Sequence, residues 1–231
     1  MLTGAGVSAE SGVPTFRDAQ TGIWARYRPE ELATEEAFRR YPRQVWSWYA
    51  ERRENLQHVQ PNAGHLAVAG FQQRHPGRLT LITQNVDGLH QKAGSTGVLA
   101  LHGNLFADRW LDACPKALYP RAACSIEQVG VGRPPRCPEC GNLARPAVVW
   151  FGEMLPMVAL RAAEYAARQC EVMLVAGTSG AVYPAAGLAH QARAAGAKVV
   201  IVGPDATDLD DIADAVLTGT SAQILPRLLE G

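Results

Sequence analysis

The sequence predicts an α/β fold, in which a Rossmann-like parallel sheet carries helices on both faces and a small domain is attached. Short apolar runs alternate with helix-like stretches, and the runs show little of the polar–apolar alternation of a strand with one face in water. Two segments break this pattern, which predicts the small domain. The 231 residues are 47% hydrophobic, enough to build a core. The expected strands are residues 79–83, 98–101, 172–176, 198–202 and, more weakly, 214–218, and the expected helices are residues 62–75, 157–169 and 184–195.

In chain order, Met1-Leu2-Thr3 is the expected first strand, and it runs directly into Gly4-Ala5-Gly6. Segment 18–63 is rich in Arg, Glu and aromatic residues without a strand pattern, so it predicts a helical insert of the small domain. Asn62 precedes an apolar-periodic run and is a candidate helix cap. Segment 105–145 holds four of the five cysteines among Pro and Gly, which predicts a loop-rich zinc-binding module. The Rossmann-like domain then comprises residues 1–17, 64–104 and 146–231.

The charge balance argues against several classes of function. With 22 basic and 22 acidic residues the formal net charge is zero, so nothing indicates an electrostatic nucleic-acid binder or a polybasic membrane module. No apolar run reaches the ~18–20 residues that cross a bilayer, and the first residues lack the pattern of a signal peptide. We therefore expect a cytoplasmic protein with neither a nucleic-acid nor a membrane partner, and take a monomer as its default state.

Small or polar residues follow five of the expected strands at their carboxyl ends. In an open parallel sheet, ligands bind at this edge. One such loop would be an ordinary turn, but five on one edge indicate a wide polar ligand such as a dinucleotide. The first loop has the spacing G-x-G-x5-G rather than the dehydrogenase pattern G-x-G-x-x-G, so phosphate binding and a plain turn both remain open there. The five loops are residues 4–12, 84–90, 102–104, 177–179 and 203–205.

Six motifs occur in order along the chain, and together they resemble the sirtuins. The resemblance covers essentially the whole chain. It implies an NAD-dependent protein lysine deacylase that acts on acylated-lysine proteins or peptides and releases nicotinamide and 2′-O-acyl-ADP-ribose. It also implies NAD as co-substrate and one structural zinc ion per chain. The motifs are Gly4-Ala5-Gly6-Val7-Ser8, Pro14-Thr15-Phe16-Arg17, Gln84-Asn85-Val86-Asp87, His102-Gly103, Val149-Trp150-Phe151-Gly152-Glu153 and Gly177-Thr178-Ser179.

The resemblance assigns catalytic roles to His102 as the base, and to Asn85 and Asp87 as groups that orient the ribose and the amide. A lone histidine at a strand end is more often a satisfied polar residue, but the place of His102 on the ligand edge favours the base, whose ordinary pKa of ~6.5 suits the task. Without the resemblance, Asn85 and Asp87 would be ordinary turn residues, and for His65 and His90 we expect no catalytic role. The implied cofactor contacts are Gly4, Ala5, Gly6, Ser8, Ala9, Thr15, Phe16, Arg17, Trp24, Gln84, Asn85, Val86, Asp87, Gly177, Thr178, Ser179, Gly203 and Ser221, and the implied peptide contacts are Val149, Phe151, Gly152 and Glu153.

Tyr49 and Arg52 are candidates for recognition of an acyl carboxylate. On a helix they are i and i+3 and share one face. Arg can pair bidentately with a carboxylate, and Tyr adds a charge-assisted hydrogen bond. From spacing alone, Tyr49 could instead pack in the core and Arg52 could be a solvated surface charge. The Y-x-x-R pattern resembles the sirtuin subclass that removes succinyl and malonyl groups, which implies a desuccinylase and demalonylase with deacetylase activity.

The cysteine cluster contains one good half of a zinc site. Cys137-Pro138-Glu139-Cys140 is a C-x-x-C knuckle, and four thiolates would form a closed structural site. The upstream half departs from the family pattern, because Trp110 stands at about the place of the first expected cysteine. The remaining ligands would be Cys114 and Cys124. The alternative is a vestigial module that is held by packing and has free thiols.

Three competing functions differ from deacylation. A protein mono-ADP-ribosyltransferase would use the same cofactor and pocket, but the label from NAD would end on protein. A non-catalytic NAD or ADP-ribose sensor, with the zinc module as its interaction surface, is disfavoured by the intact His102, Asn85 and Asp87. A Rossmann dehydrogenase is disfavoured by the glycine spacing.

Overall fold

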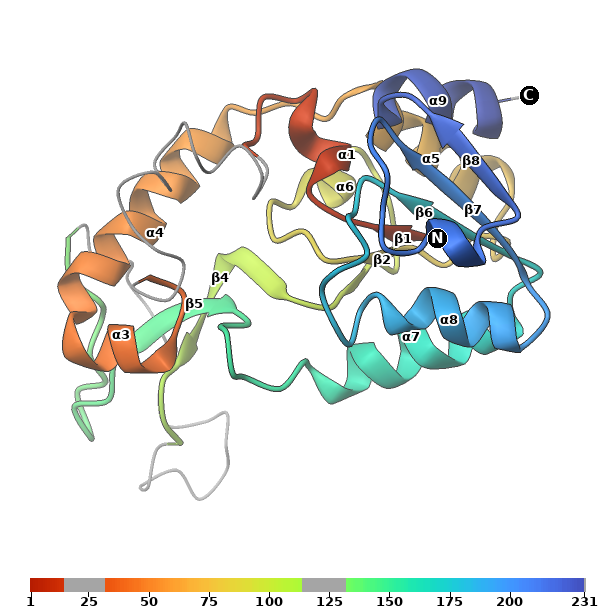
Figure 1. Cartoon of the computed structure of the whole chain (residues 1–231). Coiled ribbons are helices and arrows are strands. Elements are labelled where there is room, and N and C mark those ends of the chain that lie inside the picture. The colour runs from red at the N-terminus through yellow and green to blue at the C-terminus, as the bar shows by residue number, and fades with distance from the viewer. Residues whose placement is uncertain (15–31, 114–131, 231) are drawn as a thin grey trace.

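The computed structural model describes residues 1–14, 32–113 and 132–230. Within these ranges six parallel strands form one sheet, in the order β3-β2-β1-β6-β7-β8 (Figure 1). Strand β1 lies in the middle because it pairs with both β2 and β6, so the chain builds one half of the sheet to either side of it. This is the Rossmann-like order that the sequence predicts. The strands are β1 (Leu2–Thr3), β2 (Ile82–Thr83), β3 (Leu99–Ala100), β6 (Val172–Ala176), β7 (Lys198–Gly203) and β8 (Ala215–Thr218).

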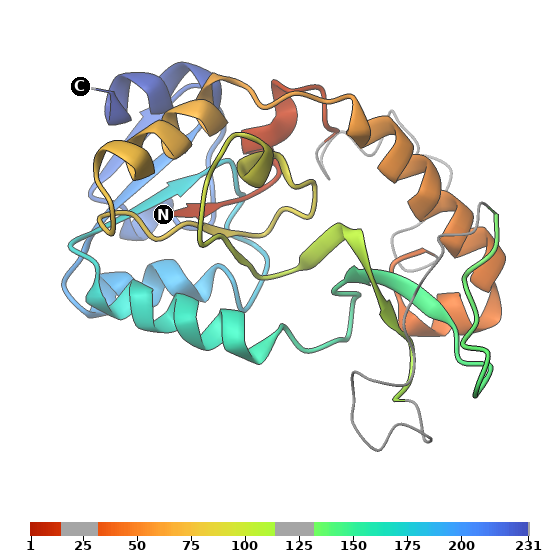
Figure 2. The ribbon, with the colours of Figure 1, turned by 180° about the vertical axis from the view of Figure 1, so that it is seen from behind.

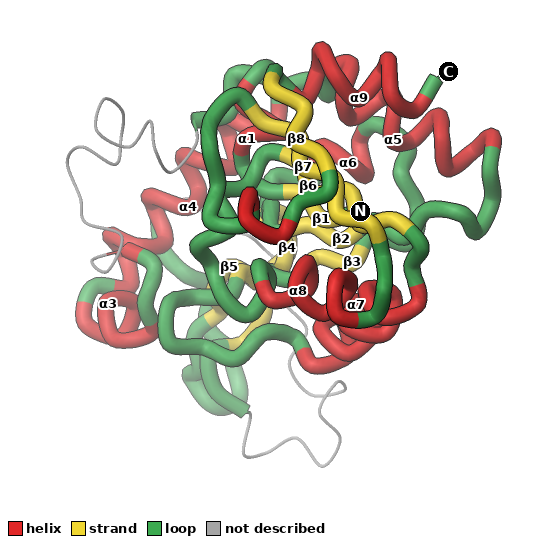
Figure 3. The backbone as a smooth tube through the Cα atoms, turned by 45° about the vertical axis from the view of Figure 1, so that its right-hand side comes forward, coloured by secondary structure: helices red, strands yellow, loops and turns green. Residues whose placement is uncertain are grey.

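Helices cover both faces of the sheet, as Figure 3 shows. The pleat of β6 explains the two layers: Met173 and Val175 pack in the core beneath α7 and α8, whereas Leu174 and Ala176 pack in the core beneath α5 and α9. No helix among the described residues is both long and apolar enough to span a membrane. The helices of this part are α1 (Gly6–Ala9), α5 (Ala63–Arg74), α6 (Leu89–Lys92), α7 (Met157–Gln169), α8 (Gly187–Ala194), α9 (Ser221–Leu229) and the short 3-10 helix at Asp210–Ile212.

A small lobe stands beside the sheet (Figure 1, Figure 2). It consists of α3 (Glu35–Arg40), α4 (Pro42–Gln57) and the antiparallel pair β4 (Gly103–Trp110) and β5 (Ala144–Val148). Its core is separate from the two cores of the sheet and is rich in aromatic side chains. The large buried aromatic residues of this core are Phe38, Trp46, Trp48, Tyr49 and Trp150.

The small lobe agrees with the sequence in its helices and differs in its strands. The described part of segment 18–63 is helical in α3 and α4, as expected. The described part of segment 105–145 is not only loop, since it holds most of β4 and the start of β5. These strands also run across the expected boundaries at residues 104 and 145. A register shift between Asn104 and Asp108 interrupts the period of two in β4, which explains why the sequence pattern did not show this strand.

Asn62 caps α5 and also holds the first loop of the sheet. Its Oδ1 accepts hydrogen bonds from Gly64 N (3.0 Å) and His65 N (3.4 Å), so the predicted helix cap is confirmed. Its Nδ2 donates to the Val7 carbonyl (2.8 Å) and to Ser11 Oγ (3.0 Å). One side chain therefore fixes both the start of α5 and the loop that follows β1.

Candidate active site

Two glycine-rich loops touch at the carboxyl edge of the sheet, one after β1 and one after β6. Gly4 N donates to the Ala176 carbonyl (3.1 Å), and Gly6 N donates to the Gly177 carbonyl (2.8 Å). Gly177 has a φ of +62°, and a Cβ there would lie 2.3 Å from the Val7 nitrogen. Only glycine fits so close an approach. The structure thus brings the two loops together, as the sequence predicts. Their close contact explains why glycine is required at these positions.

The loop after β2 adds Asn85 and Asp87 to this edge. Asn85 Nδ2 donates to the Gly4 carbonyl (3.0 Å) and to Ser8 Oγ (3.2 Å). Ser8 Oγ donates to Asp87 Oδ2 (2.7 Å), and Asp87 Oδ1 accepts from Leu89 N (2.9 Å). Asp87 is only 8% exposed, whereas Asn85 is partly open to solvent. The structure therefore joins Ser8, Asn85 and Asp87 in one network, with the amide at its surface.

Two buried histidines, for which no such role was expected, lie next to this network. Asn62 N donates to Nδ1 of His65 (3.3 Å), which leaves its Nε2 proton for Ser8 Oγ (3.4 Å). His90 packs its ring 4.8 Å from that of His65 and contacts Thr3 Oγ1 through Nε2 (3.0 Å). Burial lowers the pKa of both, that of His90 to about 3, so both rings are neutral at physiological pH. The available signal was their spacing, three residues after a polar turn residue in each case.

His102 lies at the end of β3, partly buried, next to the loop after β2. Its Nδ1 lies 3.0 Å from the Gln84 carbonyl, which can only accept, so Nδ1 carries the proton and Nε2 keeps its lone pair. Burial lowers the pKa of the imidazole, against a smaller opposite effect of the Gln84 carbonyl. Val149 N donates to the His102 carbonyl (2.8 Å). Gly103 follows with a φ of +85°, and a Cβ there would lie 2.1 Å from the Ala147 carbonyl oxygen.

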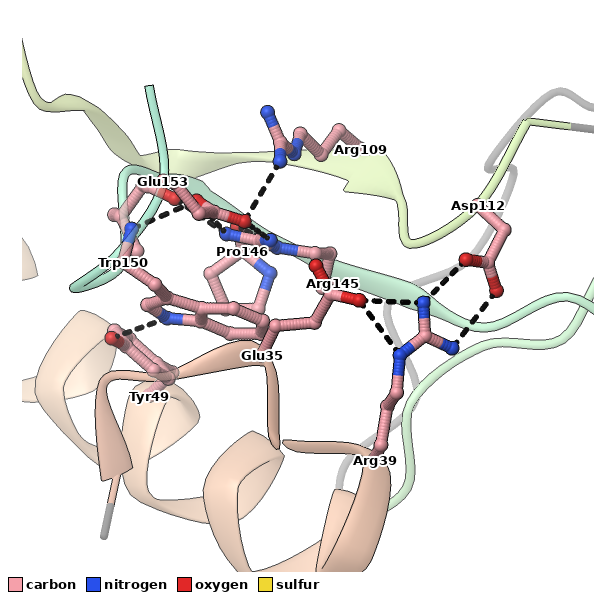
Figure 4. Close-up of polar contacts among 10 residues, drawn as sticks. Glu35, Arg39, Tyr49, Arg109, Asp112, Arg145, Pro146, Trp150 and Glu153 are labelled. Atoms are coloured by element: carbon pink, nitrogen blue, oxygen red, sulfur yellow. Dashed lines mark hydrogen bonds and ion pairs between the residues drawn. The ribbon is translucent and has the colours of Figure 1, made fainter. Parts of the chain in front are cut away.

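The expected peptide segment follows β5 and exposes part of its length. Phe151 is 55% exposed and Gly152 is exposed beside it. Glu153 is directed inward instead: its carboxylate pairs with the fully buried guanidinium of Arg145 and accepts from Trp150 N (2.8 Å) (Figure 4). Both interactions hold the pKa of Glu153 low against the effect of its own burial. Glu153 thus holds the conformation of the segment, whereas Phe151 and Gly152 form its exposed surface.

Tyr49 and Arg52 lie on α4 in the aromatic core of the small lobe. Tyr49 is 3% exposed, and its hydroxyl accepts a hydrogen bond from Trp150 Nε1 (2.9 Å). The Arg52 guanidinium lies over the Trp48 ring, 4.7 Å from its centroid, and that ring meets Tyr49 edge-on at 4.6 Å. Burial lowers the pKa of Arg52, and the Tyr49 phenol and the Asp87 carboxylate oppose that shift. Arg52 is therefore half-buried near the site, not a solvated surface charge.

The remaining candidates on the sheet edge are less uniform. Gln84 Nε2 donates to Thr178 Oγ1 (3.1 Å), which joins the loops after β2 and β6. Gly203 is buried at the end of β7, and Ser221, 2% exposed, begins α9 against Gly64. Ala5 and Ser179 are partly exposed, Val86 is half-buried and Ala9 is exposed. The candidates that lie outside the described residues are Thr15, Phe16, Arg17, Trp24, Cys114 and Cys124.

The downstream half of the expected zinc site is a tight turn. Cys137 N donates to the Asn142 carbonyl (2.8 Å), and Gly141 N donates back to the Cys137 carbonyl (2.9 Å). Cys137 is buried and Cys140 is half-buried. The described residues contain no group of three or more His, Cys, Asp or Glu side chains that could hold a metal ion. The turn and its two thiols fit one half of a tetrahedral thiolate site.

Fold and site together define an α/β protein of the Rossmann-like class, with a polar site at the carboxyl edge of its parallel sheet and a histidine at one end of that site. A model of the Sir2 family matches residues 4–184. The chain belongs to the Sir2 family, which confirms the resemblance to the sirtuins. A relative from Ralstonia nicotianae, named NAD-dependent protein deacylase, is 57% identical over 229 residues, or 99% of this chain and 89% of the relative.

Solved structures agree with this assignment. A Sir2 homologue in complex with NAD has a TM-score of 0.85 and 43% identity, over 99% of this chain and 86% of that chain. The structure of Sir2Tm bound to a propionylated peptide has a TM-score of 0.79 and 30% identity, over 99% of this chain and 90% of that chain.

Proposed function

We propose that this protein is an NAD-dependent protein lysine deacylase. The observation that carries the proposal is the state of His102, a neutral imidazole with Nδ1 engaged and Nε2 available at the polar edge of the sheet. The deacylase name of the Ralstonia nicotianae relative and the NAD and acyl-peptide complexes of Sir2 proteins support the choice of cofactor and substrate.

The loops at the sheet edge fit a dinucleotide. An amide side chain and two hydroxyls of partly exposed residues lie there, at Gln84, Thr178 and Ser179. Such neutral hydrogen-bonding groups suit the sugars and phosphates of NAD. Bound NAD would supply the ribose that receives the acyl group as nicotinamide leaves. We propose that the other cofactor-contact candidates named in the sequence analysis, including those outside the described residues, also contact NAD.

The chain's own residues divide the work of the reaction. His102 takes a proton at Nε2 while Nδ1 stays bonded to the Gln84 carbonyl, so the ring keeps one orientation throughout. Asn85, held by Gly4 and Ser8, orients the ligand at the surface of the network. Asp87 is buried and acts through Ser8, so its role is to fix the loops.

The segment after β5 is the proposed docking site for the peptide. Val149 N is bonded to the His102 carbonyl, so the segment starts beside the base. Phe151 and Gly152 are exposed, and an extended peptide could pair with the main chain there by β-augmentation. An acylated lysine on that peptide would then reach inward past the base.

We further propose that the acyl groups include succinyl and malonyl as well as acetyl. The Tyr49 phenol and the Arg52 guanidinium both contact the Trp48 ring, and the guanidinium also interacts with the Asp87 carboxylate at the site. Burial raises the pKa of Tyr49 to about 12, so the phenol stays protonated and can donate to a carboxylate. A carboxylate at the end of an acyl chain would find one charged and one neutral donor there.

Replacement of Arg52 by Met tests the acyl preference. Arg52→Met removes a charge-assisted bond worth about 1.5–3 kcal/mol, so the ratio of kcat/KM for succinyl-lysine to that for acetyl-lysine should fall at least about tenfold. Some deacetylation should remain. Arg43→Met, at an exposed position on the same helix, is the matched control and should leave the ratio unchanged. Equal loss of both activities in Arg52→Met would refute the pairing.

Incubation with NAD and matched acetyl- and succinyl-lysine peptides tests the reaction itself. We expect nicotinamide release that depends on the acylated peptide, and the acyl group on free ADP-ribose. Labelled NAD that ends on protein would instead indicate mono-ADP-ribosyl transfer, and binding without turnover would indicate a sensor. His102→Ala should lose turnover while retaining NAD binding.

We also propose a bound metal ion, a location and an oligomeric state. A structural zinc ion bound by Cys137 and Cys140 with Cys114 and Cys124 fits the knuckle turn and its thiols. We also propose a cytoplasmic protein, and the zero net charge supports the view that it binds neither nucleic acid nor membrane. We propose a monomer, for which light scattering across a range of concentrations is the direct measurement.

A further inference from the structure

Trp150 is the sole hydrogen-bond partner of the Tyr49 hydroxyl within residues 1–14, 32–113 and 132–230. The indole Nε1 lies 2.9 Å from the phenol oxygen, and both side chains are buried (Figure 4). An indole N–H is a donor only, whereas a phenol is both donor and acceptor. Trp150 therefore donates and Tyr49 accepts. The proton of Tyr49 has to point away from Trp150, toward a different acceptor.

The Tyr49 proton stays on the phenol at neutral pH and is available to a ligand. Burial raises the pKa of Tyr49 to about 12, against smaller opposite effects of Trp150 and Arg52. A buried hydroxyl whose oxygen already accepts a bond gains most from an acceptor-only partner. A carboxylate is such a partner, and because it is charged its hydrogen bond is stronger than one to a neutral carbonyl oxygen.

The direction of the indole N–H is fixed by its surroundings. The Arg145 guanidinium stacks on the Trp150 ring, with Cζ 3.3 Å from the centroid, and Phe38 packs 5.3 Å away. Arg145 is fully buried and is itself held by Glu153 and by the Val148 carbonyl (2.6 Å). Glu153 also accepts from the backbone nitrogen of Trp150 (2.8 Å). Rotation of the indole would therefore break its stacking on the Arg145 guanidinium, which the ion pair with Glu153 holds in place.

We infer that Trp150 determines acyl specificity through Tyr49, by directing the phenol proton toward a carboxylate at the end of the acyl chain. The inference rests on the proposed function, in which Tyr49 and Arg52 receive that carboxylate. Trp48 contacts both of these side chains, so one more aromatic ring keeps phenol and guanidinium together. An acetyl group has no carboxylate, so its removal gains nothing from the direction of the proton. Trp150 is a positioning residue, because it acts on the acyl group only through Tyr49.

The location of Trp150 also relates the acyl group to the peptide. It lies between Val149, whose nitrogen is bonded to the His102 carbonyl, and Phe151, whose nitrogen donates to the Ala33 carbonyl (2.9 Å). The segment proposed to hold the peptide backbone thus also carries the residue that orients Tyr49. One stretch of main chain, residues 149–151, therefore contacts the base, forms part of the proposed peptide site and carries the residue that orients Tyr49.

Replacement of Trp150 by Phe removes the N–H donor and keeps an aromatic ring. We expect the ratio of kcat/KM for succinyl-lysine to that for acetyl-lysine to fall about three- to tenfold, mainly through KM for the succinyl peptide. The ratio cancels any general loss from altered packing. Trp46→Phe is the matched control, since it makes the same change in the same core, and it should leave the ratio unchanged. Trp150→Leu, which also lacks the donor, is the second variant if the first does not fold.

A double-mutant cycle separates action through Tyr49 from a general structural effect. In a Tyr49→Phe background, Trp150→Phe should change the ratio less than twofold. An unchanged ratio in Trp150→Phe, with a wild-type enzyme that removes succinyl and loses that activity in Arg52→Met, overturns the inference and leaves the proposed function intact. A wild-type enzyme without desuccinylation overturns both.

Discussion

At the scale of single residues, the site depends on histidines kept neutral by burial. His102 donates from Nδ1 to a main-chain carbonyl, and His65 accepts at Nδ1 from a main-chain amide. The two rings are therefore opposite tautomers: the first presents a lone pair at the site, and the second presents a proton to Ser8. Each ring is fixed by the backbone, so its orientation persists when neighbouring side chains change.

The lowered pKa of His102 predicts how activity depends on pH. The base is active when deprotonated, and burial lowers its pKa from 6.5, so kcat/KM for an acetyl-lysine peptide should rise with pH through an inflection below 6.5 and then level off. The measurement is the rate of nicotinamide release between about pH 5 and pH 8 at low peptide concentration. The acetyl peptide is used because it lacks a titrating acyl carboxylate. An inflection clearly above 6.5 would contradict the buried, neutral state of His102.

At the scale of elements, loops and helix ends hold one another at the sheet edge. The loop after β1 is bonded to the loop after β6 through Gly4 and Gly6, and to the start of α5 through Asn62. The strands that lead into these loops are short. Strands β1 and β2 each span two residues, so the loops depend on these contacts for their position.

Replacement of Asn62 should show the two roles of its side chain separately. Asn62→Ala removes the helix cap and the bonds to Val7 and Ser11, and should lower the free energy of unfolding by about 1–3 kcal/mol. Asn62→Asp keeps a cap oxygen, but it loses the Nδ2 donor and places a negative charge near the Val7 carbonyl, so it should recover only the part of that loss due to the cap. Both variants should raise KM for NAD, because the loop after β1 is released. Urea unfolding and NAD kinetics measure the two effects, and wild-type stability in Asn62→Ala would show that the cap contributes nothing.

At the scale of the whole molecule, the described residues form three separate hydrophobic cores. Two lie on the faces of the sheet and one fills the small lobe, where α3, α4, β4 and β5 meet. The proposed catalytic residues stand on the sheet side, and Tyr49 and Trp150 stand on the small-lobe side. The site therefore depends on how the two parts are joined, and the strand pair that begins after His102 provides one junction.

Removal of the proposed zinc ion should affect one of these parts more than the other. We expect about one zinc ion per chain by elemental analysis and well below one in Cys137→Ser. The variant should unfold the small lobe more readily, and NAD should still bind the sheet edge, so deacylation should fall more than NAD affinity. Cys170→Ser, outside the cluster, is the control and should keep its metal. A wild-type protein with far less than one zinc ion per chain would rule the site out.

Much of the architecture follows from local patterns. Continuous apolar runs predicted strands buried on both faces, and β6 and β7 lie within one residue of the expected ranges. Because parallel strands end at one edge, the same reasoning predicted that Ser8, Asn85, Asp87 and His102 would gather there. The paired strands β4 and β5 escaped prediction, because a bulge breaks the period of one and the other contains Arg145 and Pro146 in place of an apolar run.

By itself, then, the amino-acid order determined the fold class, the family and the sheet edge proposed as the active site, because these depend on residues close together in the chain and on motifs. Only the tertiary structure decided that Trp150 meets Tyr49, that the buried Arg145 stacks on Trp150, and that His65 contacts Ser8. These contacts join residues far apart in the chain, across packed surfaces. No local period encodes such pairings, since they depend on which side chains two separately formed elements present to each other.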